Sequence, residues 1–204
     1  LPWLKQQNTR VIANIAGNTP EEYCEMAEKL SSTDVDMIEM NISCPNVKSG
    51  GVQFGTSCES VGSITSAVRK HCTKPLIVKL SPNVTDIAEI AKSAEANGAD
   101  AISMINTLTG MRIDINTKRP IIRNNTGGMS GPAVFPVAVR MVWQVSNAVK
   151  IPIIGMGGIS TWQDAVEMMI AGASALQIGT VFFSDPYAPI KIAEGINEYL
   201  DKNG

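Results

Sequence analysis

The chain reads LIVKLSPNVTDIAEIAKSAEANGADAISMIN over residues 76–106, and this stretch contains one complete strand–helix–strand pattern. Its two ends, residues 76–81 and 101–106, are apolar and rich in β-branched side chains, as expected for buried strands. Between them, Asp86 is a suitable N-cap, apolar side chains then recur with helical spacing, and Asn97-Gly98 ends the pattern. A unit of this kind predicts two parallel strands joined by a crossover helix.

The same pattern recurs along the chain, which predicts a repetitive parallel α/β fold. Apolar runs without strict alternation indicate parallel strands that are covered on both faces. Thr19-Pro20-Glu21-Glu22 predicts a capping box at the start of a further helix, Thr161 begins another helix, and residues 134–145 carry an apolar helical stripe. The expected strands are Val11–Gly17, Met37–Ser43, Leu76–Ser81, Ala101–Asn106, Ile151–Gly157 and Ala175–Thr180.

The spacing of these strands predicts a barrel with insertions at one end. The two longest insertions follow Ser43 and Asn106, at the carboxyl ends of strands, where barrels and open α/β sheets place their chemistry. Within the second insertion, residues 112–123 predict a small hairpin beside the site. We therefore expect a (β/α)8 TIM barrel with about six units in this chain, forming one domain over residues 1–204 and lacking one or two amino-terminal units. An open sheet is the alternative.

Bulk composition limits the partners of the protein. The 204 residues are 44% hydrophobic and 18% charged with a net charge of −2, which favours neither nucleic acid nor a membrane as a partner. Cys24, Cys44, Cys58 and Cys72 lack metal-binding spacing, so we expect free thiols, a cytoplasmic location and no metal site. The single histidine, His71, lies at an expected helix end, which leaves a Ser-His or Cys-His hydrolase without an obvious base.

One thiol has surroundings that suit catalysis. The sequence Asn41-Ile42-Ser43-Cys44-Pro45-Asn46 places Cys44 between two carboxamides, where an apolar strand gives way to a glycine-rich loop. Inert packing is the alternative interpretation of any free cysteine. The strand-end position favours function, because such a thiol can remove a proton from a substrate carbon while an acceptor takes the accompanying hydride.

Glycine turns after the last two strands predict a phosphate site. Gly155-Met156-Gly157-Gly158 and Gly179-Thr180 expose backbone N–H groups ahead of helices, and barrels commonly bind phosphate after strands seven and eight. Either turn alone could simply reverse the chain. The presence of both turns on adjacent final strands favours phosphate binding.

Polar side chains in or after the strands predict a pocket for a planar ligand. Lys79 interrupts an apolar strand and requires an anion or water; beside a flavin it would stabilise negative charge on the reduced ring, and a structural ion pair is the alternative. Neutral donors and acceptors suited to a ring with carbonyl and N–H groups are Asn14, Asn41, Asn46, Asn106 and Thr107. Local backbone capping is the alternative for each of these alone.

Five ordered motifs together resemble dihydroorotate dehydrogenase. The similarity runs from about residue 11 to about residue 200. The cysteine at position 44 resembles that of the class 1 enzymes, and the motif sequences are closest to the B type of that class. The motifs occupy residues 41–46 (NISCPN), 78–86 (VKLSPNVTD), 105–107 (INT), 127–133 (GGMSGPA) and 154–159 (IGMGGI).

The resemblance implies an FMN-bearing (β/α)8 barrel that oxidises (S)-dihydroorotate to orotate in pyrimidine biosynthesis. It implies Cys44 as the catalytic base. Substrate-binding residues implied by it are Asn41, Asn46, Asn106 and Thr107. The implied FMN contacts are Asn14, Asn41, Lys79, Ile105, Gly131, Gly157, Gly158, Gly179 and Thr180. B-type enzymes pair with a subunit that carries FAD and an iron–sulfur centre, and such a centre would need a separate chain, because this chain has no cysteine cluster for one. Another electron acceptor, such as fumarate, is the alternative.

Two alternatives to this assignment remain open at the level of sequence. Another FMN-dependent pyrimidine oxidoreductase, similar to dihydropyrimidine dehydrogenase, would use related strand-end motifs on uracil or thymine. An inactive flavin- or phosphate-binding barrel fragment is the second, because the family's first strand and a substrate-binding Lys and Asn pair have no counterpart before Val11. Exposed strand edges in such a barrel would favour pairing with a second copy of the chain, a homodimer.

Overall fold

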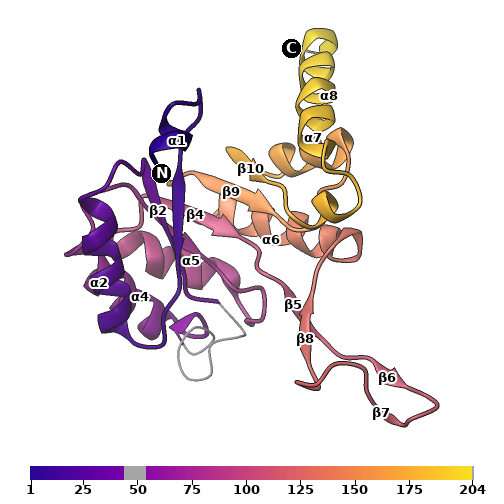
Figure 1. Cartoon of the computed structure of the whole chain (residues 1–204), viewed down its shortest axis with the longest axis horizontal. Coiled ribbons are helices and arrows are strands. Elements are labelled where there is room, and N and C mark those ends of the chain that lie inside the picture. Colours follow the sequence, from indigo (N-terminus) through magenta and orange to yellow (C-terminus); the bar gives the residue numbers. More distant parts are fainter. Residues whose placement is uncertain (44–53, 204) are drawn as a thin grey trace.

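A computed structural model describes residues 1–43 and 54–203 and shows a curled parallel sheet (Figure 1). Six strands follow one another in the order β1, β2, β3, β4, β9 and β10, and every neighbouring pair is parallel. Each strand falls within a run predicted from sequence, which confirms a partial (β/α)8 barrel. Their bounds are β1 Ile12–Ile15, β2 Met37–Asn41, β3 Leu76–Lys79, β4 Ala101–Met104, β9 Ile153–Met156 and β10 Ala175–Gln177.

Helices follow the strands and form the outer layer of the fold. Successive helices pack against one another from α2 through α8, so the helical layer curves with the sheet. The α-helices are α1 Pro2–Lys5, α2 Pro20–Ser31, α4 Cys58–Arg69, α5 Ile87–Ala96, α6 Phe135–Ser146, α7 Trp162–Ile170 and α8 Ala188–Asn203; two short 3-10 helices are η1 Pro132–Val134 and η2 Thr180–Phe183. None of the described helices is both long and apolar enough to cross a membrane.

Side-chain caps begin the helices largely as predicted. Asp86 accepts hydrogen bonds from the backbone N–H groups of Ala88 and Glu89, and Thr161 forms a complete capping box with Asp164. Thr19 also accepts from the N–H of Glu22, but the capping box predicted there is incomplete. The Glu22 carboxylate accepts from the backbone N–H of Asn18 instead of that of Thr19.

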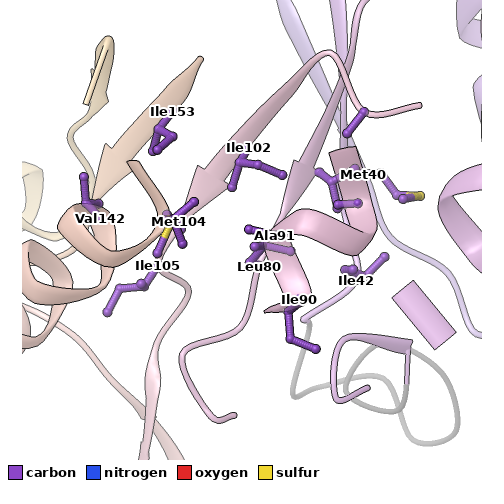
Figure 2. Packing of buried hydrophobic residues seen from close by; sticks show 14 of the residues in the cluster. Met40, Ile42, Leu80, Ile90, Ala91, Ile102, Met104, Ile105, Val142 and Ile153 are labelled. Atoms are coloured by element: carbon purple, nitrogen blue, oxygen red, sulfur yellow. The ribbon is translucent and has the colours of Figure 1, made fainter. Parts of the chain in front are cut away.

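The hydrophobic core lies between the sheet and the helices (Figure 2). Met40 of β2, Ile102 and Met104 of β4, and Leu80 just after β3 are fully buried members of this cluster. Burying one such side chain contributes about 1.5–3 kcal/mol relative to leaving it exposed. The opposite face of the sheet is therefore free to carry polar side chains, because the stability comes from the helix-covered face.

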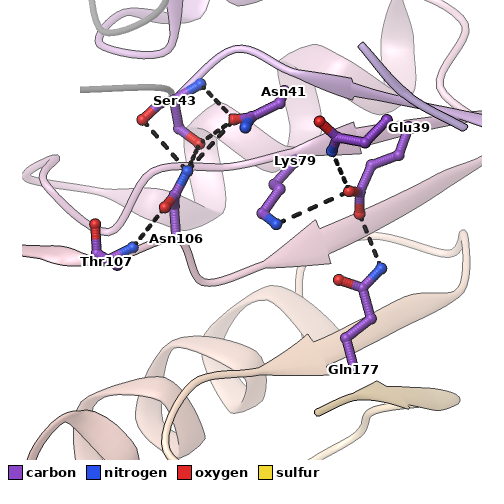
Figure 3. Close-up of polar contacts among 8 residues, drawn as sticks. Glu39, Asn41, Ser43, Lys79, Asn106, Thr107 and Gln177 are labelled. Atoms are coloured by element: carbon purple, nitrogen blue, oxygen red, sulfur yellow. Dashed lines mark hydrogen bonds and ion pairs between the residues drawn. The ribbon is translucent and has the colours of Figure 1, made fainter. Parts of the chain in front are cut away.

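A hydrogen bond across the sheet interior shows how strongly the sheet curls. Gln177 of β10 donates to Glu39 of β2 over 3.0 Å, although four strand steps separate the two strands (Figure 3). In a flat sheet these strands would lie about 19 Å apart. The sheet therefore bends until its concave face brings β2 and β10 within reach of each other.

The insertion after β4 contains two antiparallel pairs. The predicted hairpin is confirmed by β6 (Ile113–Asp114) and β7 (Arg119–Pro120), which project away from the main sheet (Figure 1). A second pair, β5 (Leu108–Gly110) with β8 (Gly127–Met129), was not predicted and forms the base of the same excursion. It places residues 130–131 next to the carboxyl ends of the strands.

Two helix-to-strand joints use the same backbone geometry. Gly98 after α5 and Gly172 after α7 have φ values of 101° and 116°, a region that side chains with a Cβ rarely adopt. A Cβ on Gly172 would also lie 2.3 Å from the Cβ of Ser146 in α6. The repeated Asn/Ala-Gly-Ala pattern in the sequence therefore reflects a conformational requirement.

Gly172→Ala is expected to lower the free energy of unfolding by about 2 kcal/mol or more, because it combines a left-handed backbone with a steric overlap. Urea denaturation followed by circular dichroism measures the change. Gly110→Ala is the matched control, because φ there is not left-handed and the new Cβ would meet Met129 at an ordinary 3.5 Å. Equal losses in the two variants would contradict the argument.

Asp36 attaches the amino-terminal segment to the sheet. Its carboxylate accepts from Lys5 Nζ at 2.7 Å and from the Val11 N–H at 2.8 Å, and pairs with Arg10 at 3.2 Å. The Lys5 hydrogen bond, followed by the Val11 amide, lowers the pKa of Asp36 from 3.8 to about 2. Because the folded pKa lies below the unfolded value, this stabilisation is complete above pH 3.8 and is lost as the pH falls through about 2.

Asp36→Asn is accordingly expected to be less stable than the parent at neutral pH, with the difference shrinking as the pH falls from 3.8 towards 2. Unfolding midpoints in urea, measured at several pH values, test this. Asp34→Asn, an exposed carboxylate two residues away, serves as the control. A constant difference between Asp36→Asn and the parent over that pH interval would show that the carboxylate charge is not the cause.

Candidate functional site

A cavity of about 510 Å³ opens at the carboxyl ends of β4, β9 and β10. This volume lies in the usual range of ligand sites, about 300–1,000 Å³. The structure brings most of the predicted site residues to its wall: Lys79, Ile105, Asn106, Thr107, Gly131, Gly157, Gly158, Gly179 and Thr180. Residues from five separate parts of the sequence therefore converge on one space.

The glycine turns bring backbone close to this cavity. Gly157 and Gly158 follow β9 with φ values of 121° and 81°, and a Cβ on Gly158 would lie 2.7 Å from the carbonyl oxygen of Gly131. A Cβ on Gly131 or Gly179 would meet nothing within 4 Å, so both leave open space at the wall. Thr180 and Ser130 join the two sides through a 3.0 Å hydrogen bond between their hydroxyl groups. The arrangement has the bare backbone and open space that a phosphate group requires.

A buried charged network lies beneath the cavity (Figure 3). Glu39 is 4% exposed, and its carboxylate accepts from Asn14 at 2.5 Å and from Gln177 at 3.0 Å. Lys79 Nζ lies 3.8 Å from the same carboxylate. Lys79 therefore forms the structural ion pair that was one of the two interpretations, and it also lines the cavity; its role beside a flavin stays a prediction.

Glu39 and Gln177 belong to the site although no sequence motif indicated them. Each is a lone polar residue within an apolar strand, as Lys79 is. The available signal was spacing: Glu39 precedes Asn41 by two residues, so both side chains lie on the same face of β2. The partner strand cannot be identified from spacing alone, because it lies 138 residues further along the chain.

A second network joins the ends of β2 and β4 (Figure 3). Asn106 donates to the hydroxyl of Ser43 at 2.6 Å and to the side-chain oxygen of Asn41 at 3.3 Å, and its own oxygen accepts from the Thr107 N–H at 2.7 Å. Ser43 in turn donates to Asn41 at 2.9 Å. The carboxamides of Asn41 and Asn106 are thus held beside each other at the strand ends.

Tyr23 of α2 contacts both Asn41 and Phe54, the described residues on either side of the interval that contains Cys44. Its fully buried ring packs edge-on against Phe54 with centroids 6.1 Å apart, and its hydroxyl donates to the Asn41 carbonyl at 2.7 Å. Asn41 and Phe54 lie on either side of residues 44–53, which are outside the described part of the chain. Cys44 and Asn46, the predicted base and one predicted substrate ligand, lie in that interval.

Two predicted cofactor contacts, Asn14 and Asn41, do not line the cavity. Each is hydrogen-bonded to a residue of the networks at its wall, Asn14 to Glu39 and Asn41 to Asn106. Among residues 1–43 and 54–203, no group of three or more His, Cys, Asp or Glu side chains could hold a metal ion.

The remaining cysteines and the histidine lie away from the cavity. Cys24, Cys58 and Cys72 are free thiols, as predicted. Burial, with Glu21 and Glu28 nearby, raises the pKa of Cys24 above its ordinary value. His71 is half-exposed and faces Glu28 at 3.4 Å. A raised pKa disfavours the thiolate, so Cys24 is poorly suited to nucleophilic or base chemistry.

The curled parallel sheet, with a ligand-sized cavity at the carboxyl ends of its strands, defines the class of (β/α) barrels that bind their ligands at this end. Residues 1–200 match the dihydroorotate dehydrogenase family, and the chain belongs to that family.

Similar proteins agree with this assignment. A "dihydroorotate dehydrogenase B (NAD(+)), catalytic subunit" from Alkaliphilus oremlandii is 57% identical over 99% of the chain, which corresponds to 67% of that relative. Proteins of the same name from Parabacteroides distasonis and Geotalea uraniireducens are 57% and 58% identical over the whole chain, again 67% of each relative. The chain thus spans about two thirds of the length of these relatives.

Tyr23→Phe is expected to lower the free energy of unfolding by about 1 kcal/mol, because it removes a buried hydroxyl that donates to Asn41. Thermal and urea unfolding measure the change. Tyr187→Phe is the control, since Tyr187 is 67% exposed. If both variants retain parental stability, the hydroxyl does not hold the strand end.

Proposed function

We propose that the protein oxidises (S)-dihydroorotate to orotate in pyrimidine biosynthesis, with FMN as the hydride acceptor. The observation that carries this proposal is the convergence of three elements on one cavity: the cation Lys79, the glycine turns after β9 and β10, and the Asn106-Thr107 pair. Membership of the dihydroorotate dehydrogenase family supports the same reaction. We further propose that residues 1–204 form one FMN-binding domain.

The cation and the bare glycine backbone of the cavity wall support FMN as the ligand. The phosphate would lie against the backbone of Gly157, Gly158, Gly179 and Thr180, where open space and glycine backbone allow close approach. Lys79 would face the pyrimidine side of the isoalloxazine ring, with Ile105 and Gly131 contributing apolar wall and open backbone. Asn14 and Asn41 would complete the set from β1 and β2. When bound, FMN supplies a two-electron acceptor for the substrate hydride.

The chain itself supplies proton removal and substrate orientation. Cys44 would take the proton from C5 of dihydroorotate while the hydride leaves C6, so that a carbon–carbon double bond forms in orotate. Asn41, Asn46, Asn106 and Thr107 would bind the ring and its carboxylate with neutral donors and acceptors. Asn41 and Asn106 are already hydrogen-bonded to each other, which reduces the cost of orienting them for a ligand.

Electrons leaving this site would pass to a separate subunit with FAD and an iron–sulfur centre. The relatives carry the words "catalytic subunit" and "NAD(+)" in their names, which supports a separate electron carrier. We also propose a homodimer and a cytoplasmic location; the free thiols Cys24, Cys58 and Cys72 support the latter.

Purified protein loaded with FMN is expected to bleach the flavin absorbance on anaerobic addition of dihydroorotate. Uracil and thymine are tested in parallel on protein whose FMN has first been reduced chemically, because oxidation of that reduced flavin by these compounds would favour a dihydropyrimidine dehydrogenase-like enzyme. Retention of FMN without a response to any of the three would favour an inactive flavin-binding protein.

Cys44→Ala should retain FMN yet lose dihydroorotate oxidation by a factor of roughly 100 or more, because general-base catalysis contributes at least that much. Stopped-flow measurement of flavin reduction gives the rate. Cys58→Ala, which changes an exposed thiol at the start of α4, is the matched control. Parental rates in Cys44→Ala would refute the assignment of the base.

A further inference from the structure

The described wall of the cavity carries a single charge. Among its described lining residues, Lys79 is the sole charged side chain. The nearest carboxylate recorded for it is Glu39, which does not line the cavity and lies beneath it at 4% exposure. The charge presented to any ligand in this cavity therefore depends on how these two groups are arranged.

Glu39 balances Lys79 without occupying its hydrogen-bond donors. The 3.8 Å separation exceeds hydrogen-bond length, so the contact is an ion pair only. The carboxylate oxygens are instead occupied by the side-chain amides of Asn14 and Gln177. Within residues 1–43 and 54–203, no hydrogen bond from the Lys79 ammonium is recorded, so its donors remain available to a ligand in the cavity while a buried negative charge lies 3.8 Å away.

The anchoring amides fix the carboxylate in place. Asn14 belongs to β1 and Gln177 to β10, the two ends of the strand order, so Glu39 is held from both sides of the concave face. Ser103, the neighbour of Lys79 in the β3–β4 register, is fully buried, and its hydroxyl has no hydrogen-bond partner among the described residues. No charge other than Glu39 is thus recorded against Lys79 from the described strands packed beside it.

We propose that Glu39 is a positioning residue that, through Lys79, sets the electron affinity of the bound flavin. This inference rests on the proposed function. A lysine near the flavin favours the negatively charged reduced ring, and a carboxylate behind the lysine weakens that effect. Glu39 therefore holds the flavin at a lower midpoint potential than Lys79 alone would produce.

The test is Glu39→Gln in the FMN-loaded protein, which keeps the shape of the side chain and removes its charge. One of the two acceptor oxygens becomes an NH2 donor, and the amide of Asn14 or Gln177 can turn over to accept from it. Reduced FMN should bind at least tenfold more tightly relative to oxidised FMN than in the parent. For this two-electron couple, that corresponds to a midpoint potential about 30 mV more positive. Glu25→Gln is the matched control, because Glu25 pairs with Lys29 at 2.6 Å on the exposed face of α2.

A double variant tests whether the effect runs through Lys79. In a Lys79→Gln background, Glu39→Gln should change the potential by much less than it does in the parent. An equal shift in both backgrounds would overturn the proposal, as would a parental potential in Glu39→Gln. If Glu39→Gln does not fold, Glu39→Asp takes its place; it withdraws the charge by one methylene and should shift the potential in the same direction.

Failure of the proposed function gives a different result. A parent protein that does not take up FMN, or whose flavin dihydroorotate does not reduce, contradicts the proposed function. Glu39 is then tested in flavin-free protein by the rate at which an amine-directed acylating reagent labels Lys79, read by mass spectrometry. That rate should rise several-fold in Glu39→Gln, because the amine has lost its counter-ion, and an unchanged rate would overturn the inference.

Discussion

The hydrogen bond from Gln177 to Glu39 is the contact on which the arrangement of the site depends. It joins the second and the last strand of the six-stranded order across the concave face, over 3.0 Å. This contact requires the sheet to be curled. The same curl brings the loops after β9 and β10 opposite the ends of β3 and β4, so that Lys79, Asn106 and the glycine turns share one cavity.

Burying this network has an energetic consequence. A buried carboxylate loses its hydration, and a single ion pair at 3.8 Å compensates poorly for that loss. The amides of Asn14 and Gln177 also donate to this carboxylate, and these two hydrogen bonds offset part of the remaining desolvation energy. The stability of the fold comes mainly from the helix-covered face, where Met40, Ile102 and Met104 are buried. The concave face can then carry charges that serve a ligand.

The sequence predicted the strands and most of the cavity wall for a clear physical reason. Strands covered on both faces are nearly continuous in apolar residues, so all six could be located, and parallel strands align their carboxyl ends. Residues just after them, such as Asn106, Gly157 and Thr180, could therefore be assigned to one site, whereas Ile105 and Gly131 were assigned through the family resemblance. The glycine turn at Gly157 and Gly158 could also be located because it follows a strand, and both residues have the positive φ values that favour glycine.

Other parts of the structure were not accessible from sequence, for equally physical reasons. Glu39 and Gln177 are single polar residues within strands, and their pairing depends on curvature, which local spacing does not encode. The β5–β8 pair includes the glycine-rich segment Gly127–Met129, which carries no alternating pattern. The capping box predicted at Thr19 is incomplete because Glu22 binds the backbone of Asn18, one residue earlier than expected.

The two polar networks differ in charge, and this difference gives them different roles in the site. The Asn41–Ser43–Asn106 network has neutral members only, so it can exchange partners with a ligand without exposing an unpaired charge. The Glu39 network holds a buried charge and cannot exchange partners at similar cost. A ligand that enters the cavity can therefore rearrange the strand-end amides, while the ion pair behind Lys79 keeps its geometry. The fixed network determines the electrostatics of the site, and the neutral network adapts to the ligand.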